Sequence, residues 1–313
     1  MRVVFLGTGA GMPSRRRNVS SVALDLTEEN EGIWLFDCGE GTQHQLLKSP
    51  LKTGKINRLF VTHLHGDHIY GIPGLLTSRG YVGGTTPLVV YGPKGIKPFI
   101  TSVLDISDAR LAYDCEIIEI EEGMLFSEGD YTVSVKKLEH RIDSYGFRIE
   151  EKDRIGSLDA DKLRQLGVPP GPLYGRLKLG HPVELPDGTV LHGRDFIGPG
   201  CQGRNLAILG DTRYCRAAIE LAEGVDLLVH EATFSGELAD LAYQYYHATS
   251  RQAAQIAKEA GVRTLVLTHI SQRYQDDAEQ LQTEAREIFR RTYLAEDLWS
   301  IEIPWSAKAE TEE

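Results

Sequence analysis

The sequence has few cysteines and lacks long apolar runs. The four cysteines (Cys38, Cys115, Cys201 and Cys215) are scattered, and no C-x-x-C pair occurs. A disulfide framework and a thiolate zinc site are therefore not expected. No run of about 18 apolar residues is present, so we expect no membrane span and no membrane partner. The first apolar run, residues 3–6, is too short for a signal-peptide core, which predicts a cytoplasmic location.

Basic residues are fewer than acidic residues. The 313 residues carry 34 Lys and Arg against 45 Asp and Glu, which gives a formal net charge of −11. This balance counts against a protein that coats nucleic acid with one basic face. The charge is uneven, however, because residues 114–130 hold seven acidic and no basic residues, whereas residues 162–183 hold four basic and no acidic ones. Any contact with RNA is therefore expected to be local.

Short apolar runs rich in β-branched residues alternate with helix-like stretches, which predicts an α/β fold built in layers. The expected strands are residues 3–6, 22–26, 33–37, 59–62, 88–91, 115–120, 132–138, 145–149, 206–209, 227–229 and 264–268. The expected helices are residues 42–47, 69–78, 213–221, 250–260 and 277–291. Thr249 or Ser250 is the expected N-cap of the helix that precedes Gly261, where a glycine suits the residue after a helix end.

One segment breaks this alternation. Residues 152–195 contain seven glycines and five prolines, with the sequence GVPPGPLYG at residues 167–175. Proline at this density excludes a central strand or a continuous helix. Long segments of this kind inside a domain are usually functional or disordered. We therefore expect one domain over residues 1–305, with an arm that projects from it at residues 152–195, and a disordered polar tail at residues 306–313.

The densest group of metal-binding side chains is VTHLHGDH, residues 61–68. It fits the pattern H-x-H-x-D-H with His63, His65, Asp67 and His68, directly after an apolar run that predicts a strand. The carboxyl end of a strand is where α/β folds usually place their sites. Imidazole nitrogen and carboxylate oxygen are the donors of catalytic zinc sites, and crowding so many of them together is unfavourable without a cation.

Three further polar residues, His140, Asp211 and His269, each end a later apolar run. Singly, each is more often an ordinary strand-end residue. As a series they are expected to meet the first cluster at one rim of the sheets, which brings the set to seven ligands. Seven ligands suit two metal ions with a bridging carboxylate. Asp211 is the natural bridge, because it is the lone carboxylate among the distant ligands.

In this order, the ligands resemble the pattern of the metallo-β-lactamase superfamily over nearly the whole chain, and within it the ribonuclease Z family. The closer likeness is carried by FLGTGAGMPSRRRN (5–18), DCGEGTQHQ (37–45), HEAT (230–233) and HATSRQAA (247–254). The arm falls between His140 and Asp211, where that family carries its substrate-binding exosite. The resemblance implies an αβ/βα sandwich, in which two mixed sheets face each other with helices outside, and a protruding Gly/Pro-rich arm.

The resemblance also implies a function. It implies a zinc-dependent endoribonuclease that removes the 3′ trailer of precursor tRNA, cutting after the discriminator nucleotide to leave a 3′-hydroxyl on the tRNA and a 5′-phosphate on the trailer. It implies a homodimer in which the arm of one subunit serves the site of the other. Finally, it implies two Zn²⁺ per subunit, one held by His63, His65, His140 and Asp211, and one held by Asp67, His68, Asp211 and His269.

One loop departs from the family pattern. Where that family has P-x-K-x-R-N, residues 200–205 read GCQGRN, so that Gly200 and Gln202 replace the proline and the lysine, whereas Arg204 and Asn205 are kept. The family's loop is associated with rejecting tRNAs that already end in CCA. This rejection is therefore not predicted for the present chain, while hydrolysis is.

The chemistry requires an acid that is not a metal ligand, because a leaving alkoxide needs a proton. His247 is the candidate, oriented by Glu231, and the resemblance suggests the same pair; the alternative is a surface histidine after an aromatic run. Asp67 is a candidate base as well as a ligand, although a zinc-bound carboxylate is a weak base. Asp37 is expected to support the ligands from behind.

Basic residues supply the candidate RNA contacts. Arg273, four residues after His269, is placed to hold a phosphate, residues 15–17 are placed to touch the acceptor stem, and Arg204 belongs to the loop described above. The arm cations are Lys162, Arg164, Arg176 and Lys178, which we expect to grip phosphates of the tRNA elbow. Binding should weaken steeply with salt. The alternatives are a solvated charged surface and a flexible linker.

Two other functions fit parts of the pattern. A small-molecule phosphodiesterase or thioester hydrolase of the same superfamily would use the same metal ligands, but it has no use for a distant exosite. A metal-binding RNA module without catalysis is expected to have lost ligands or the proton donor, whereas every expected ligand is present in this chain.

Overall fold

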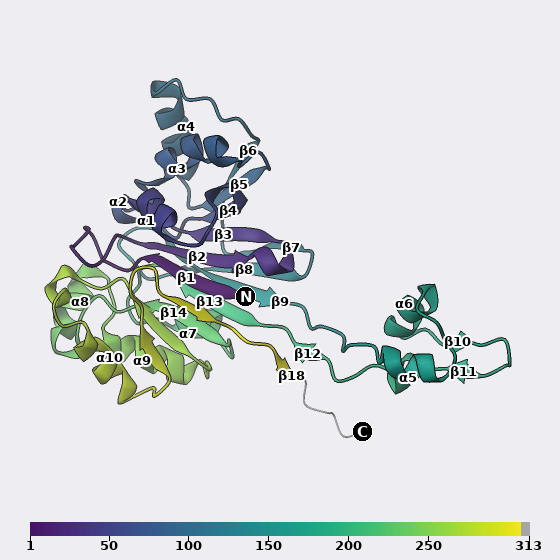
Figure 1. Cartoon of the computed structure of the whole chain (residues 1–313). Coiled ribbons are helices and arrows are strands. Elements are labelled where there is room, and N and C mark those ends of the chain that lie inside the picture. The colour runs from purple at the N-terminus through teal and green to yellow at the C-terminus, as the bar shows by residue number, and fades with distance from the viewer. Residues whose placement is uncertain (308–313) are drawn as a thin grey trace. The chain divides into compact units, whose positions relative to one another are not determined.

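The computed structural model describes residues 1–307, which form two compact units (Figure 1). Unit 1 contains residues 1–150 and 205–303, and unit 2 contains residues 151–204 and 304–307. Within the described residues, no helix combines the length and the apolar character that a bilayer span requires. Of the tail predicted to be disordered, Ser306–Ala307 form strand β18, and residues 308–313 lie outside the described residues.

Unit 1 is built on two mixed sheets of seven strands each. The first sheet, in the order β17-β1-β2-β3-β4-β5-β6, contains β1 (Arg2–Gly7), β2 (Ser21–Leu26), β3 (Gly32–Phe36), β4 (Ile56–Phe60), β5 (Leu88–Gly92), β6 (Cys115–Glu119) and β17 (Ser300–Glu302). The second sheet, in the order β16-β15-β14-β13-β9-β8-β7, contains β7 (Gly123–Glu128), β8 (Tyr131–Leu138), β9 (Ser144–Glu151), β13 (Asn205–Leu209), β14 (Leu227–Glu231), β15 (Leu265–Thr268) and β16 (Thr292–Leu294). Every predicted strand is present, and β7, β16 and β17 were not predicted.

The two sheets face each other across an aromatic core. Alternate residues of the first sheet, such as Phe5, Phe36 and Phe60, point inward and meet Phe126 and Phe147 from the second. The Phe60 and Phe147 rings pack edge to face at 5.2 Å between centroids, the geometry that aromatic pairs prefer. Alternation with a period of two residues thus sends one face of each sheet into a shared core.

The outer faces of both sheets are covered by helices (Figure 1). On the first sheet lie α1 (Thr42–Lys48), α3 (Ile72–Arg79) and α4 (Ile96–Ile106), and on the second lie α7 (Arg216–Leu221), α9 (Ser250–Glu259) and α10 (Glu279–Arg286). The α9 helix starts with the predicted cap, because Thr249 and Gln252 form a reciprocal capping box. The predicted αβ/βα sandwich is confirmed.

The predicted helix at residues 69–78 is wrong in one respect, since it is two helices, α2 (Gly66–Ile69) and α3. They are separated because the turn that follows β3 packs against them backbone to backbone. A Cβ on Gly71 would lie 2.2 Å from the carbonyl oxygen of Gly39, and a Cβ on Gly39 would lie 2.2 Å from the carbonyl oxygen of Asp67. Only glycine permits such close approach. This contact fixes the position of the loop that carries H-x-H-x-D-H.

Unit 2 has a hydrophobic core of its own. It contains α5 (Ala160–Gln165), α6 (Pro172–Lys178) and a hairpin of β10 (Val183–Glu184) and β11 (Val190–Leu191). Its buried side chains are Leu163, Val168, Leu177, Val183, Leu191 and Phe196. Pro172 begins α6, where the missing N–H costs nothing. The segment predicted as a Gly/Pro-rich arm is therefore a small folded unit, with its prolines placed between elements or at a helix start.

The two ends of the segment 151–204 are joined to each other. Arg204 is only 3% exposed, and its Nε donates to Glu151 Oε2 at 2.6 Å. The Trp305 ring packs against the guanidinium groups of Arg204 and Arg154, at 4.0 and 3.9 Å. Strand β12 (Cys201–Gln202) pairs with β18 beside them. The prediction that Arg204 contacts RNA is not supported by this geometry, because its charge is buried against Glu151.

Candidate metal centre

The seven predicted ligands come together at the rim of unit 1, where the strands of both sheets end. They are contributed by the loop after β4, by α2, and by the residues that follow β8, β13 and β15. Their ligand atoms form two groups, each within 4.8 Å: His63, His65, His140 and Asp211, and Asp67, His68 and His269. The convergence expected from the strand ends is therefore present in the described residues.

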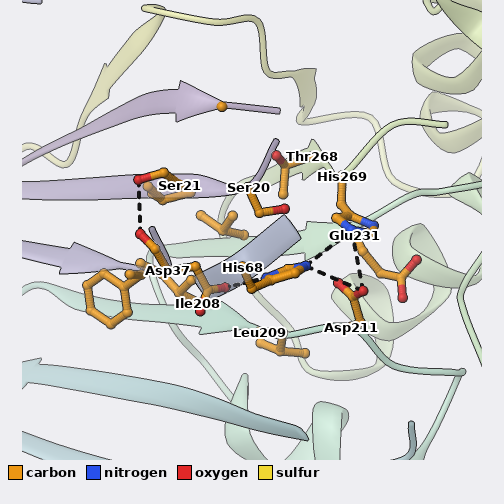
Figure 2. A pocket seen from close by; sticks show the side chains of 14 residues that line it. Ser20, Ser21, Asp37, His68, Ile208, Leu209, Asp211, Glu231, Thr268 and His269 are labelled. Carbon is orange, nitrogen blue, oxygen red and sulfur yellow. Dashed lines mark hydrogen bonds and ion pairs between the residues drawn. The ribbon is translucent and has the colours of Figure 1, made fainter. Parts of the chain in front are cut away.

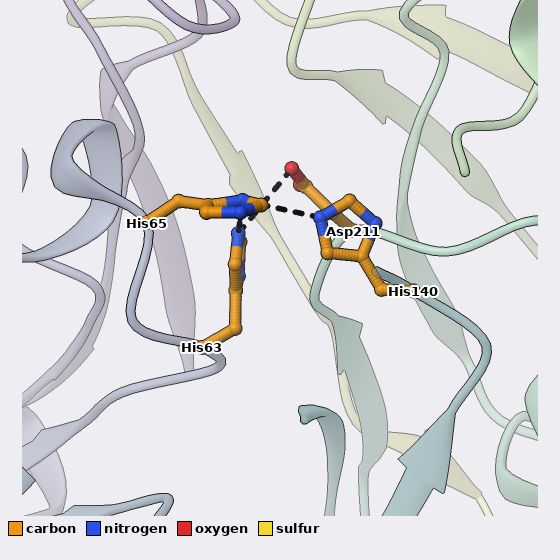
Figure 3. Close-up of side chains that lie close together, drawn as sticks. All are labelled: His63, His65, His140 and Asp211. Carbon is orange, nitrogen blue, oxygen red and sulfur yellow. Dashed lines mark hydrogen bonds and ion pairs between the residues drawn. The ribbon is translucent and has the colours of Figure 1, made fainter. Parts of the chain in front are cut away.

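The first group surrounds one point in space (Figure 3). His65 Nδ1 lies 3.1 Å from His63 Nε2 and 3.2 Å from His140 Nε2. Asp211 Oδ2 lies 3.5 Å from His63 Nε2. Three nitrogens and one carboxylate oxygen at these separations are donors that a metal ion such as zinc accepts.

The second group also lies next to Asp211, and Figure 2 shows two of its members, His68 and His269, beside that carboxylate. His269 Nε2 is 3.3 Å from His68 Nε2 and 3.4 Å from Asp67 Oδ2. Asp211 Oδ2 is 3.3 Å from His269 Nε2 and 3.6 Å from His68 Nε2. One oxygen of Asp211 therefore faces both groups, which is the position that a bridging ligand requires. A small cavity of about 20 Å³, room for one water, lies behind these residues.

Hydroxyl and carboxylate partners fix the tautomers of two imidazoles from behind. Thr62 Oγ1 donates its single hydrogen to Asp37 Oδ2 at 2.8 Å, so it accepts from His63 Nδ1 at 2.9 Å. Asp37 Oδ2 also accepts from His68 Nδ1 at 2.7 Å. With Nδ1–H engaged in both rings, each presents Nε2 to the site, as metal binding requires. Asp37 therefore has the supporting position expected for it.

Two more imidazoles are oriented in the same way. Thr233 Oγ1 donates to Glu231 Oε2 at 2.6 Å and so accepts from His269 Nδ1 at 2.9 Å. His140 Nδ1 donates to the carbonyl oxygen of Tyr246 at 2.8 Å. These partners were not predicted. Thr233 lies two residues after Glu231 in HEAT, on the same side of an extended chain, and this spacing is the signal that would have indicated it.

Buried charges shape the electrostatics of the site. Burial opposes ionisation of Asp211, but electrostatic interactions with the surrounding imidazoles of His269, His68 and His63 outweigh it and hold the pKa of the carboxyl well below its usual range. Burial is also the main reason that the pKa of His63 lies well below its usual value. An ionised carboxylate among imidazole nitrogens attracts a cation. The donor set of nitrogen and carboxylate oxygen fits zinc, and its number fits two metal ions.

His247 and Glu231 form a pair beside the ligands. His247 Nδ1 donates to Glu231 Oε1 at 2.9 Å, and the same oxygen accepts from the Thr212 backbone N–H at 2.8 Å. Burial lowers the pKa of His247, but the buried Glu231 carboxylate outweighs it and raises the pKa to about 9. His247 Nδ1 also lies 3.8 Å from Asp211 Oδ2, within reach of a metal. Because this nitrogen is committed to Glu231, the ring has Nε2 left to offer, as a proton donor needs.

The basic residues predicted to contact RNA lie in different surroundings. Arg273 is exposed in the 3-10 turn Gln272–Tyr274. Arg15 and Arg16 are exposed, but Arg17 is buried and donates to Thr8 Oγ1 and to the Ala295 carbonyl oxygen at 2.7 and 2.6 Å. Arg17 therefore joins the N-terminal loop to the C-terminal strands of unit 1 and does not face solvent, contrary to the prediction for residues 15–17.

The four arm cations are exposed on unit 2. Lys162 Nζ donates to the Asp195 carbonyl oxygen at 2.9 Å, and Arg164 pairs with Asp161 one turn earlier in α5. Arg176 and Lys178 occupy the last turn of α6. Three of the four therefore have no carboxylate partner among residues 1–307, while Arg164 is already neutralised.

The fold agrees with that of known proteins. Residues 194–270 match the family model described as Beta-lactamase superfamily domain, and residues 1–165 match the model described as Anti-Pycsar protein Apyc1. The metallo-β-lactamase fold protein YhfI from Bacillus subtilis shares the fold, with a TM-score of 0.67 and 20% identity over 96% of this chain and 98% of that one. Fold and site together define a hydrolase of the metallo-β-lactamase class, with clustered side chains that could hold metal ions.

The nearer relatives narrow this class. Ribonuclease Z of Bacillus cereus is 56% identical over 305 residues, which cover 97% of this chain and 99% of that protein. The crystal structure of human tRNase Z, short form, superposes with a TM-score of 0.70 and 32% identity over 97% of this chain and all of that one. The chain belongs to the ribonuclease Z family.

Proposed function

We propose that this chain is a metal-dependent endoribonuclease that removes the 3′ trailer of precursor tRNA. The observation that carries the proposal is the convergence of seven ligands and the His247–Glu231 pair, in a chain 56% identical to ribonuclease Z over nearly its full length. In this proposal the enzyme cuts after the discriminator nucleotide. The tRNA then keeps a 3′-hydroxyl, and the trailer carries a 5′-phosphate.

The proposed metals are two Zn²⁺ per subunit. His63, His65 and His140 would hold one, Asp67, His68 and His269 would hold the other, and Asp211 would be shared. When bound, they would lower the pKa of the attacking water to about 7 and offset charge on the phosphate. Asp67 Oδ2 already accepts from the Gly11 backbone N–H at 2.7 Å and faces His269, which favours its role as a ligand over that of a base.

His247 and Glu231 act on the leaving group in this proposal. Attack on the phosphorus breaks the bond to the 3′ oxygen of the tRNA, which then needs a proton. His247 donates it from Nε2, because Nδ1 is held by Glu231. Glu231 fixes the ring and balances the charge of the imidazolium, and its own position is held by Thr212 and Thr233.

Substrate selection is assigned to unit 2, whose exposed cations suit the phosphates of a folded RNA. Lys162, Arg176 and Lys178 lack acidic partners in the described residues and are the contacts we favour. Arg273, exposed near His269, is a candidate for contact with the phosphates near the cut.

We also propose that the protein is a homodimer in the cytoplasm, in which unit 2 of one subunit serves the site of the other. The mass of the protein in solution tests the dimer, and its distribution among cell fractions tests the location.

The deciding experiment is cleavage of a 3′-extended precursor tRNA by the zinc-loaded protein, with both product ends mapped. A single cut after the discriminator nucleotide is expected, and zinc-loaded His247→Ala is the matched control that should bind normally but cut about 10²–10⁴-fold more slowly. An intact precursor, together with hydrolysis of a small phosphodiester or thioester, would overturn the assignment and favour a small-molecule hydrolase of the same class.

A further inference from the structure

A patch of tyrosine and arginine side chains lies beside the metal centre and is not used by the proposed chemistry. It is formed by the end of α8 (Ala239–Tyr245) with the residues that follow β8 and β13. Its members, here called the Tyr–Arg platform, are Arg141, Arg213, Tyr243 and Tyr246. Each is close in sequence to a site residue: Arg141 follows His140, Arg213 follows Asp211 by two residues, and Tyr246 precedes His247.

The platform is a stack held together by Arg213. Its guanidinium carbon lies 3.8 Å from the ring centroid of Tyr243 and 3.6 Å from that of Tyr246. Its Nε also donates to the Tyr243 carbonyl oxygen at 2.8 Å. Arg141 lies farther out, 6.0 Å from the Tyr246 ring. Tyr243 remains 64% exposed although Arg213 covers part of it, so ring surface is left for another planar group.

The platform is tied to a metal ligand through the backbone. Tyr246 ends α8 in the left-handed region at φ 64°, an unusual conformation for a residue with a bulky side chain. In this conformation its carbonyl oxygen accepts from His140 Nδ1 at 2.8 Å. The ring that packs against Arg213 and the carbonyl that orients His140 thus belong to the same residue, which fixes the distance between platform and site.

The charge of the platform suits a phosphate-bearing ligand. Neither Arg141 nor Arg213 has a carboxylate within ion-pair distance in the part of the chain that the structure describes. The neighbouring Asp143 is paired with Lys137 at 2.6 Å. The two guanidinium groups therefore place unneutralised positive charge at one edge of the site, in a chain with a net charge of −11. Exposed aromatic faces combined with cations are the means by which proteins bind unpaired nucleotides.

The position of His247 indicates which nucleotide of the precursor tRNA the platform binds. In the proposed reaction His247 protonates the 3′ oxygen of the last nucleotide that the tRNA keeps. That nucleotide must therefore lie on the His247 side of the scissile phosphate, and the two tyrosines of the platform, Tyr243 and Tyr246, lie four residues and one residue before His247 in the chain. We propose that the platform binds this unpaired nucleotide, stacking its base on Tyr243 and holding its phosphate with Arg141. The proposal rests on the proposed function and adds the subsite on the leaving-group side.

The test removes either the ring of Tyr243 from the protein or the base of the proposed nucleotide from the precursor. Tyr243→Ala should lower kcat/KM for precursor tRNA about 10-fold or more, as expected for the loss of one stacked base, whereas Tyr243→Phe should not. Tyr81→Ala, which removes another highly exposed tyrosine, is the matched control. On a precursor with an abasic nucleotide just before the cut, Tyr243→Ala should have no further effect. Binding of the precursor to zinc-loaded His247→Ala, with and without Tyr243→Ala, gives a readout that does not depend on turnover.

The possible results separate the subsite from the enzyme. If the wild-type protein does not cut precursor tRNA, the proposed function fails. If it cuts and Tyr243→Ala behaves as the wild type, only the platform fails. If Tyr243→Ala is equally impaired on the abasic precursor, the tyrosine does not contact that base. If its effect vanishes instead when the first trailer nucleotide is abasic, the platform serves the trailer, and the assignment to the leaving-group side is wrong.

Discussion

In unit 1 the side chains that carry the chemistry are held in place by hydrogen bonds, whereas the candidate RNA-binding cations of unit 2 are exposed on its surface. Four of the imidazoles in unit 1 are held from behind by a hydroxyl, a carboxylate or a carbonyl. The cations of unit 2 are exposed around a core of six buried side chains. Metal binding needs donors that keep their geometry, while gripping phosphates needs charge that remains in water and adapts to the RNA.

The larger core of unit 1 can hold strained backbone in place, and the smaller core of unit 2 holds none, which agrees with this difference between the two units. Unit 1 supports several residues in the left-handed region close to the site, among them Asp37, Tyr246 and His269 at φ 57°, 64° and 56°. Such conformations cost of order 1–3 kcal/mol each and persist only when the surroundings enforce them. In unit 2, positive φ among the described residues is confined to glycine. The small unit therefore carries no comparable backbone strain.

The largest effect is expected from Asp211→Ala, which removes the oxygen that faces both ligand groups. Activity on precursor tRNA and on a small diester should both fall more than about 10³-fold, since several kcal/mol of charge stabilisation is lost. Zinc content, measured by elemental analysis, should fall with them. Asp143→Ala, which removes an exposed carboxylate paired with Lys137, is the control. Full zinc content in Asp211→Ala would contradict the bridging role.

The next largest effect is expected from His247→Ala. The value of kcat on precursor tRNA should fall about 10²–10⁴-fold, the usual contribution of a general acid. Zinc content should stay unchanged, because Nδ1 of His247 is bound to Glu231. Glu231→Gln should show a smaller loss of the same kind. Loss of zinc in His247→Ala would instead make it a ligand, as its 3.8 Å separation from Asp211 permits.

Unit 2 should show the opposite behaviour. Replacing Lys162, Arg164, Arg176 and Lys178 together by alanine should weaken precursor binding and leave hydrolysis of a small diester intact. The plot of log affinity against log salt should become shallower by about 3, because three of the four cations lack acidic partners. Circular dichroism checks that unit 2 still folds. An unchanged salt dependence would show that the phosphates are gripped elsewhere.

A smaller effect is expected from Thr233→Val, which removes the hydroxyl between His269 and Glu231 and keeps the shape of the side chain. Zinc affinity, measured by competition with a chelator, should fall about 10–100-fold, as for other partners of metal ligands. Thr233→Ser keeps the hydroxyl and should stay near the wild type. Equal affinities for the two variants would mean that packing alone orients His269.

The metal ligands could be predicted from the sequence because each follows an apolar run, and strand ends of neighbouring strands meet at one rim. His140, Asp211 and His269 were predicted on this basis and lie together. The helix α4 was not predicted, since its β-branched residues and Pro98 are poor helix formers; burial of Ile96 and Ile100 decides its structure.

Features made by distant residues could not be predicted in this way. Arg204 seemed available for RNA because its partner Glu151 lies 53 residues earlier in the chain. The core of unit 2 is assembled from single apolar residues dispersed among glycines and prolines, so no periodicity marks it. The Tyr–Arg platform draws on three separate segments, and the sequence indicates only the aromatic run at its centre.

The backbone contact between the turn after β3 and the ligand loop limits how far this chain can vary. Gly39 and Gly71 touch neither metal nor RNA in the proposed mechanism, yet at neither position is there room for a single methyl group. Any larger residue there would displace the segment that holds His63, His65, Asp67 and His68. In a saturation mutagenesis screen for activity, these two inconspicuous glycines should therefore tolerate replacement as poorly as the metal ligands themselves.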